Sequence, residues 1–460
     1  ASWPAAWPKK RRAQALARPA QRPGPEAPEY LTARERFAAR RFQGALRAVR
    51  PFIWPFETGK RTIRQGRLLH GSAKNRPPGE PGKRAIFSNL CPKTAMKNLF
   101  QPFTFNNGVE IPNRLAVAPM THFASTPQGR ISEEERLFLQ GRASGFGLFI
   151  AAATLVSPEG QSFEGEPYAI SAADVPSLSE VAKIIQAQGA KAILQLHHGG
   201  KLAEKHLIGG LDKIAPSDDS ATGSRAMTEA EIARVIAAFG HAAEWAIQAG
   251  FDGVEIHGAN GYLLQQFYSG HSNRRADEWG QNRLRFPLAV TDAVLAAREK
   301  HRCPGFIIGY RFSPEEPQEN GITMAETFAL VDALVQKPLQ YLHVSLHDFF
   351  SCARRGADSQ RMRVDLLHQH IGGKLPLMAV GGLLTAAQIE KAWATGAAEL
   401  IALGRAVLLN SNMAELLKSG EYDRIETELD PAQKAKYRYP ENLWKRNMQN
   451  AGFLPKVKGA

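Results

Sequence analysis

The stretch MTEAEIARVIAAFGHAAEWAIQAGFDGVEIH, residues 227–257, decides the fold because it contains one complete helix followed by one strand. Thr228 is followed three residues later by Glu231, which is the pattern of a capping box at a helix N-terminus. Apolar residues then recur with helical spacing over about six turns. The short hydrophobic run at 251–257 is typical of a buried strand. We therefore predict a capped amphipathic helix that leads directly into a strand.

The same alternation of strand and helix continues from about residue 113 to residue 409. Strands without a polar face, joined by helices, indicate parallel pairing with both faces of the sheet covered. Eight such units predict an α/β fold, a closed (β/α)8 TIM barrel rather than an open doubly wound sheet. No GxGxxG follows the first strand, which also disfavours a dinucleotide-binding sheet. The expected strands are LAVAPM, GLFIAAAT, KAILQLH, FDGVEIH, GFIIGYRF, YLHVSL, LPLMAV and AELIAL.

Two local patterns add detail to the barrel. Ser132 and Glu135 precede the first predicted helix with the spacing of a second capping box. The segment QPFTFNNGVEIP, residues 101–112, precedes the first strand and predicts a hairpin across the bottom of the barrel.

The charge of +14 is confined to the N-terminal fifth of the chain. Residues 1–95 hold 21 Lys and Arg against 5 Asp and Glu, whereas the other 365 residues hold 37 and 39. Residues 1–95 are rich in Pro, Arg and Ala and show no helical or strand period, so we expect an unstructured basic extension. We predict a single globular domain over residues 96–460, and its near-neutral charge gives no reason to expect a nucleic-acid partner.

Three explanations of residues 1–95 stay open. All eight methionines lie at or after Met96, and globular patterning begins there, which favours a physiological start at Met96 and an extension translated from upstream DNA. The alternatives are a mitochondrial-type transit peptide, which is Arg-rich and poor in acids, and a basic arm that contacts nucleic acid.

Cysteine content and hydropathy exclude several protein classes. Cys91, Cys303 and Cys352 have no spacing that suggests a disulfide framework, a zinc site or an iron–sulfur site. The longest uncharged stretch, residues 143–158, is shorter than the roughly 18 apolar residues of a membrane-spanning helix. We therefore expect a cytoplasmic protein without a membrane partner, and its oligomeric state is left open between monomer and homo-oligomer.

Barrel enzymes carry their chemistry at the carboxyl ends of the strands. After the last two predicted strands come Gly381-Gly382 and Gly404-Arg405, and backbone N–H groups beside an arginine at this position favour a phosphate site. The other strand ends carry neutral hydrogen-bonding groups and Arg311, which can stabilise negative charge on a reduced ring. No carboxylate pair suits glycoside hydrolysis and no ligand set suits a catalytic metal.

Taken together, the predicted strands and the residues at their carboxyl ends resemble the Old Yellow Enzyme family of FMN-dependent NAD(P)H oxidoreductases. The resemblance extends from about residue 103 to residue 409. It implies noncovalent FMN, NADH or NADPH as reductant and a small-molecule electron acceptor. The supporting segments are PNRLAVAPMTHFAS, AKAILQLHHGGK, MTEAEIARVIAAFGHAAEWAIQAGFDGVEIHGANGYLLQQFYS, SNRRADEWG, GYRFSPEE and VGGLLTAAQIEKAWATGAAELIALGRAVL.

The resemblance also implies roles for individual residues. His257 and Asn260 would hold a substrate carbonyl, and Tyr262 would donate a proton to the carbon next to it. Cofactor contacts are implied for Pro119, Met120, Thr121, Ala153, Gln195, Arg311, Gly381, Gly382, Gly404 and Arg405.

Some positions depart from the family pattern. Thr121 stands where some branches carry a cysteine that tunes the flavin, and Phe123 stands where such branches carry a tyrosine. The roles of His197 and His198, which follow Gln195, stay open between substrate contact and packing. Two alternative functions also remain: another FMN barrel oxidoreductase with a different acceptor, and a catalytically weak flavin-binding protein.

Overall fold

A computed structural model describes residues 92–449, 452 and 454–459. The predicted basic extension lies outside the described residues, except that α2 (Pro92–Leu99) includes its last four positions. Met96 lies inside this helix and its side chain is buried. The proposed boundary at Met96 therefore falls within a helix, and the division of the chain at that point stays a prediction.

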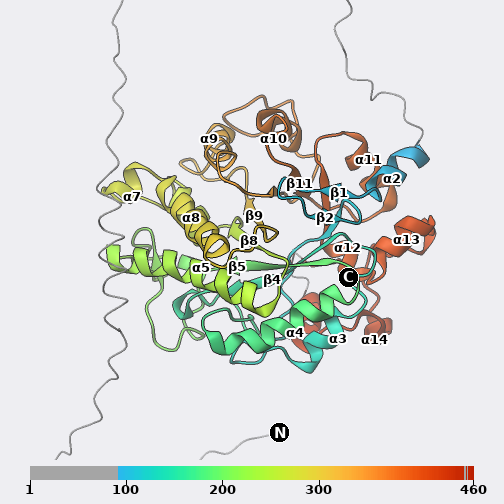
Figure 1. Cartoon of the computed structure of the whole chain (residues 1–460), viewed down its shortest axis with the longest axis horizontal. Helices are drawn as coiled ribbons and strands as arrows, with labels where there is room; N and C mark the ends of the chain where they lie inside the picture. Colours follow the sequence, from blue (N-terminus) through green and yellow to red (C-terminus); the bar gives the residue numbers. More distant parts are fainter. Residues whose placement is uncertain (1–91, 450–451, 453, 460) are drawn as a thin grey trace, which may run out of the picture. The chain divides into compact units, whose positions relative to one another are not determined.

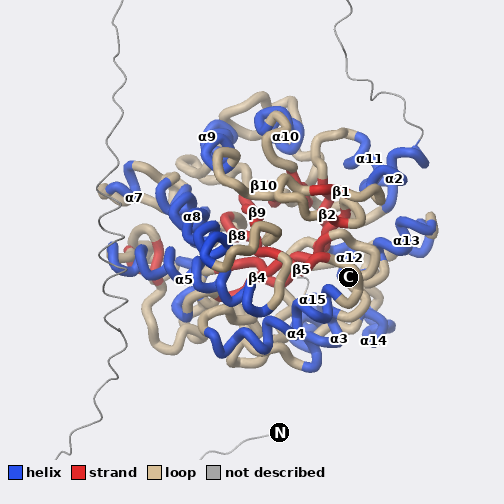
Figure 2. Tube along the Cα trace, in the orientation of Figure 1, coloured by secondary structure: helices blue, strands red, loops and turns tan. Residues whose placement is uncertain are grey.

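Eight parallel strands close into a barrel, with β12 pairing β3 through Ile401 and Leu115. The ring runs in chain order, and Figure 2 shows these strands gathered at the centre of the described residues. The predicted (β/α)8 barrel is confirmed. Its strands are β3 (Leu115–Val117), β4 (Leu148–Leu155), β5 (Lys191–His197), β8 (Gly253–Gly258), β9 (Ile307–Phe312), β10 (Tyr341–Ser345), β11 (Leu377–Val380) and β12 (Leu400–Leu403).

Helices surround the strands in Figure 1. Each turns an apolar stripe towards the barrel: in the longest, Ile232, Val235 and Phe239 recur at helical spacing and are fully buried. Burial of such stripes is the main source of stability for these helices. Those that follow the strands are α3 (Glu133–Leu139), α4 (Val175–Gln186), α5 (Glu229–Ala249), α8 (Arg285–Lys300), α9 (Met324–Leu334), α10 (Arg363–Ile371), α11 (Ala386–Ala394) and α12 (Arg405–Leu409).

A hairpin closes the end of the barrel at which the strands begin. Its strands, β1 (Phe103–Thr104) and β2 (Glu110–Ile111), pair antiparallel as predicted. Phe105 and Ile111 are buried in the same hydrophobic cluster as residues of the barrel interior, including Ile193. The interior is therefore filled at this end, and the opposite end is left for a site.

The helix caps only partly follow the sequence pattern. Thr228 and Glu231 make the predicted reciprocal capping box of α5. Ser132 accepts a hydrogen bond from the backbone N–H of Glu135, but the Glu135 carboxylate does not return to the cap. It accepts from Ser125 Oγ at 2.8 Å and lies 3.1 Å from His122 Nε2 instead. The second capping box was a wrong prediction, because a buried polar partner competes for this carboxylate.

Additional elements connect and extend the barrel. The connections contain β6 (Ile214–Ala215), β7 (Arg225–Ala226), α6 (Leu263–Tyr268) and α7 (Glu278–Gln281), and the C-terminal tail contains α13 (Met413–Ser419), α14 (Lys434–Tyr437) and α15 (Glu441–Met448). The sequence analysis assigned no structure to this tail, yet Tyr437 and Leu443 are almost fully buried. Among the described residues, no helix is long and apolar enough to span a membrane.

Replacing Thr228 with Ala should lower the free energy of unfolding by about 1 kcal/mol, since the α5 N-terminus loses its side-chain acceptor and Glu231 loses its partner. Thr228→Ser keeps the hydroxyl and is expected to stay close to the parent protein. Urea denaturation of the three proteins measures the difference. Equal stability of Thr228→Ala and the parent would contradict the role of the capping box.

Candidate active site

A cavity of about 860 Å³ lies at the carboxyl ends of the barrel strands. Its volume is in the range of sites that hold a cofactor or a drug-sized ligand. Four of the sequence-predicted residues are absent from its wall: Ala153, Gln195, His257 and Gly381. The predicted residues that do line it are Pro119, Met120, Thr121, Asn260, Tyr262, Arg311, Gly382, Gly404 and Arg405.

One part of this cavity is suited to an anion. Gly382 has φ +65°, and the Arg405 guanidinium lies 3.2 Å from the position that a Cβ of residue 382 would take. A Cβ at Gly381 would come 2.4 Å from the backbone nitrogen of Phe349, so glycine is needed for this close approach. Arg405 makes no ion pair with any residue that the structure describes. Its guanidinium and the adjacent backbone can therefore take a phosphate.

A buried carboxylate lies inside the barrel below the cavity. Glu255 is fully buried and accepts hydrogen bonds from Gln195 Nε2 at 2.8 Å and Tyr341 Oη at 3.1 Å, and His343 Nδ1 lies 2.8 Å away. Burial alone would raise the pKa of Glu255, but His343, Arg311 and Gln195 outweigh it and lower that pKa. The side-chain amide of Gln195 is therefore directed to Glu255.

Arg311 connects this interior to the cavity. Its Nη2 donates to Ser345 Oγ at 3.0 Å, and its Nε has no hydrogen-bond partner within the described part of the chain. Burial lowers the pKa of Arg311, and the nearby carboxylate of Glu255 opposes that shift. A buried guanidinium that lines the cavity can stabilise an anion that forms there.

Three aromatic rings meet where β5 and β8 end. The centroid of the Tyr262 ring lies 4.3 Å from that of His197 and 5.1 Å from that of His257. Burial raises the pKa of Tyr262 to about 12, and the Glu166 carboxylate adds to the shift. Burial also lowers the pKa of His257 well below its usual range, so its imidazole is neutral near pH 7. Tyr262 therefore stays protonated, as a proton donor must.

The segment between His257 and Tyr262 turns tightly. Asn260 and Gly261 have φ of +59° and +78°, and a Cβ at Gly258 would lie 2.4 Å from Tyr310 Oη. Asn260 Oδ1 accepts from Ser345 Oγ at 3.0 Å, which is the same hydroxyl that accepts from Arg311. The turn therefore places Asn260 on the cavity wall, while the His257 side chain is buried beside Tyr262.

The structure assigns different environments to His197 and His198. His197 Nδ1 lies 2.7 Å from Glu166 Oε1, both side chains are fully buried, and the His197 ring packs on Tyr262. His198 Nδ1 accepts from the backbone of Gly200 at 3.0 Å, so His198 supports the loop after β5. The two histidines therefore have different surroundings, and neither lines the cavity.

Several cavity residues were missed by the sequence analysis. Phe163 lies in the loop after β4, Ser345 ends β10, and Arg446 and Leu454 belong to the C-terminal tail. Ser345 stands at the end of the predicted strand YLHVSL, one of the polar strand ends that the sequence shows, but it was assigned no role. The tail has no barrel pattern, and nothing in its sequence indicates which surface it covers.

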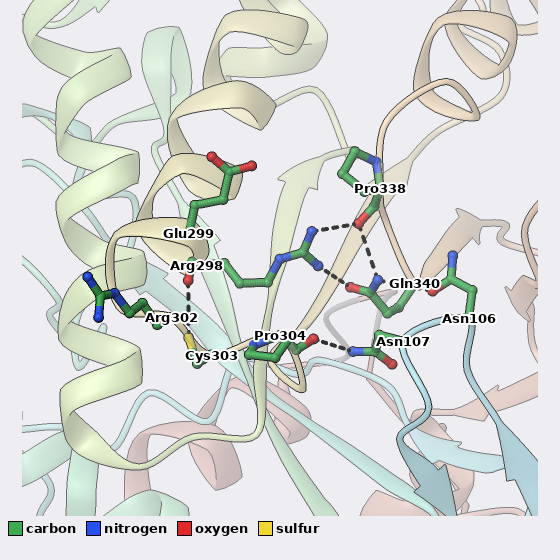
Figure 3. A pocket seen from close by; sticks show the side chains of 9 residues that line it. All are labelled: Asn106, Asn107, Arg298, Glu299, Arg302, Cys303, Pro304, Pro338 and Gln340. Carbon is green, nitrogen blue, oxygen red and sulfur yellow. Dashed lines mark hydrogen bonds between the residues drawn. The ribbon is translucent and has the colours of Figure 1, made fainter.

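A second cavity, of about 420 Å³, lies at the other end of the barrel, near the starts of β9 and β10 (Figure 3). Arg298 donates there to Gln340 Oε1 at 3.0 Å and to the Pro338 carbonyl at 3.1 Å. Arg302 and Cys303 also line it. None of the residues predicted for the site lines this second cavity.

Comparison with known proteins agrees with this geometry. The NADH:flavin oxidoreductase / NADH oxidase family matches residues 98–424. The chain belongs to this family. It is 47% identical over 365 residues to a probable NADH-dependent flavin oxidoreductase of Bacillus subtilis, an alignment that covers 78% of this chain and 98% of that protein.

Two solved structures also resemble the described residues. Morphinone reductase has a TM-score of 0.60 and 27% identity, covering 70% of this chain and 90% of its own. An Old Yellow Enzyme homologue from Zymomonas mobilis has a TM-score of 0.64 and 26% identity, covering 75% and 99%. The resemblance to the Old Yellow Enzyme family is confirmed. The chain is an NAD(P)H-dependent flavin oxidoreductase, with FMN as its cofactor.

Replacing Arg405 with Gln should weaken FMN binding roughly 10- to 100-fold, because a charge-assisted contact to the phosphate is lost. Arg302→Gln removes the same charge from the second cavity and serves as the matched control. Titration of each flavin-free protein with FMN, followed by quenching of flavin fluorescence, gives the affinities. If both variants bind FMN like the parent protein, Arg405 is not the phosphate ligand.

Proposed function

We propose that the chain reduces activated C=C bonds, such as those of enones, and other electron-poor acceptors at the expense of NAD(P)H. The observation that carries this proposal is that Tyr262, Asn260 and Arg311 line the same cavity as the anion-binding residues Gly382 and Arg405. The proposed proton donor Tyr262 and the cation Arg311 thereby share one cavity with the proposed phosphate-binding residues. We also propose that residues 96–460 act as one oxidoreductase domain.

The residues at the phosphate end and the barrel centre suit FMN. Gly382, Gly404 and Arg405 would hold its phosphate, while Pro119, Met120 and Thr121 would line its ring. Gly381, Ala153 and Gln195 would support these contacts from behind the cavity wall. When bound, FMN would supply the hydride-transfer chemistry between the nicotinamide and the acceptor. Arg311 would stabilise the negative charge that such a ring carries when reduced.

His257 and Asn260 would bind the carbonyl oxygen of the acceptor. A neutral His257 can donate through one ring nitrogen, which suits a carbonyl on which negative charge grows. Asn260 keeps its amide nitrogen for the ligand, since its Oδ1 accepts from Ser345. The His257 side chain is buried beside Tyr262 behind the cavity wall, so its proposed role follows from the family resemblance.

Tyr262 would deliver the proton to the carbon next to the carbonyl. Its raised pKa keeps the hydroxyl protonated at neutral pH, and its ring is fixed between His197 and His257. A proton donor fixed in this way contributes roughly 10²- to 10⁴-fold to a rate.

Tyr262→Phe should slow the reduction of cyclohexenone at least 100-fold, because the transferable proton is lost. Oxidation of NADH with a quinone as acceptor, which needs no proton delivery to carbon, should continue. Rapid-mixing absorbance of the flavin during each half-reaction measures both rates.

Tyr439→Phe is the matched control for that experiment. Tyr439 is also buried, and its hydroxyl has no hydrogen-bond partner among the described residues, so its loss removes no hydrogen bond. Cyclohexenone reduction by this variant should match the parent protein. A parallel loss of quinone and enone reduction in Tyr262→Phe would exclude Tyr262 as the specific proton donor.

The pH dependence of enone reduction should follow the raised pKa of Tyr262. Because the protonated hydroxyl is the active form, the rate is present below the pKa and is lost as pH rises through it. With a pKa of about 12, the rate constant should stay level up to about pH 11. An ordinary tyrosine would give a decline centred near about pH 10. Such a decline in the oxidative half-reaction would contradict the proposed environment of the hydroxyl.

A further inference from the structure

Arg446 reaches the large cavity from a part of the chain outside the barrel. It lies on α15, and its guanidinium carbon is 4.3 Å from the centroid of the Phe123 ring. Both residues line the cavity that also contains Tyr262. A cation over an aromatic face is held by the ring quadrupole while its N–H groups stay available at the edge.

A continuous series of rings connects Arg446 to the proposed proton donor. Phe123 packs against Phe163 with a centroid distance of 5.8 Å, and Phe163 packs against His197 at 5.8 Å. His197 in turn packs edge-to-face on Tyr262 at 4.3 Å. Arg446 and Tyr262 therefore line the same cavity and are connected by ring contacts through Phe123, Phe163 and His197.

Helix α15 is fixed by contacts that do not involve Arg446. Leu443 and Asn447 are fully buried, and Asn447 Nδ2 donates to the Pro455 carbonyl at 2.9 Å. Lys445, on the same helix, is exposed and lies 3.9 Å from Glu441. Arg446 is half-buried and has no carboxylate within ion-pair distance in the described ranges 92–449, 452 and 454–459. Its position is thus set by the helix and by Phe123, which leaves its charge without a protein counterion.

No carboxylate that the structure describes on the cavity wall forms an ion pair with Arg446. Five arginines and two carboxylate residues line the cavity. Glu315 pairs with Arg363, while Arg405 stands at the phosphate end and Arg311 lies above the buried Glu255. Arg354 completes the five, and Arg446 contacts the ring series through the Phe123 ring. A partly desolvated cation needs a counter-charge, and here the ligand can supply it.

We infer that Arg446 binds a carboxylate of the acceptor, so that the acceptor class is an α,β-unsaturated carbonyl compound that carries a separate carboxylate. The guanidinium presents paired N–H donors that match the two oxygens of a carboxylate. One carbonyl of the acceptor would face His257 and Asn260, and the carboxylate would face Arg446. This inference rests on the proposed function, because it extends the same acceptor site.

Two esters that differ only in charge test the inference. Monomethyl fumarate carries one carboxylate, whereas dimethyl fumarate is neutral and otherwise similar. In the FMN-loaded full chain, Arg446→Gln should shift the ratio of the two KM values roughly 10- to 100-fold in favour of the diester, as expected for the loss of charge-assisted hydrogen bonds. Arg446→Lys should restore part of the preference, because it keeps the charge but not the fork.

Lys445→Gln provides the matched control, since it removes one positive charge from the same helix outside the cavity wall. It should leave the KM ratio unchanged. An unchanged ratio in Arg446→Gln would overturn the inference. So would a rise of both KM values together, because it would mean that Arg446 only shapes the cavity.

A binding measurement separates this inference from the proposed function. Monomethyl and dimethyl succinate are saturated and cannot be reduced, and their binding is read from changes in flavin absorbance. If neither fumarate ester is reduced, the ene-reductase proposal is contradicted. If Arg446→Gln nevertheless loses the binding of monomethyl succinate that the parent protein shows, the carboxylate site is still supported. If monomethyl succinate binds equally well to the parent protein and to Arg446→Gln, the carboxylate site is contradicted, whether or not the fumarate esters are reduced.

Discussion

The closed ring of parallel strands is the constraint on which the site depends. Because all eight strands run in the same direction, their carboxyl ends lie at one rim, and residues far apart in sequence meet there. Pro119, Tyr262, Arg311, Gly382 and Arg405 come from five different strand ends and line one cavity. The hairpin that fills the other end of the barrel leaves this rim as the place for a ligand.

Inside the ring, one buried charge organises the polar residues below the cavity. An ionised Glu255 without partners would cost several kcal/mol, so it is surrounded by Gln195, Tyr341, His343 and Arg311. Arg311 then donates to Ser345, and Ser345 donates to Asn260 on the cavity wall. The carboxylate therefore positions a cation and an amide that the acceptor and the flavin would meet, although Glu255 itself is not part of the wall.

Sequence reasoning worked where one residue type has one structural use. The strand and helix periods predicted the barrel, and Gly382 has the left-handed conformation expected of a glycine at a phosphate loop. It failed where a side chain has more than one available partner. Glu135 has the spacing of a capping box, but a buried histidine and serine compete for it.

The C-terminal tail shows a second limit. Arg446 contributes to the cavity only because α15 packs beside Phe123, a tertiary contact that no local pattern encodes. His197 likewise gains its position beside Tyr262 from the pairing of β5 with β8, and from a buried Glu166 that lies in a different loop. Roles that depend on such contacts become visible only when the chain is folded.

The most direct test of the central claim is a double-mixing absorbance experiment on the full chain loaded with FMN. NADH or NADPH is mixed first under anaerobic conditions, and cyclohexenone is added once the flavin spectrum has stopped changing. The expected result is loss of the oxidised flavin band in the first step and its return in the second, with one equivalent of saturated ketone formed. A flavin that neither nicotinamide reduces, or a reduced flavin that no enone reoxidises, would contradict the proposed function.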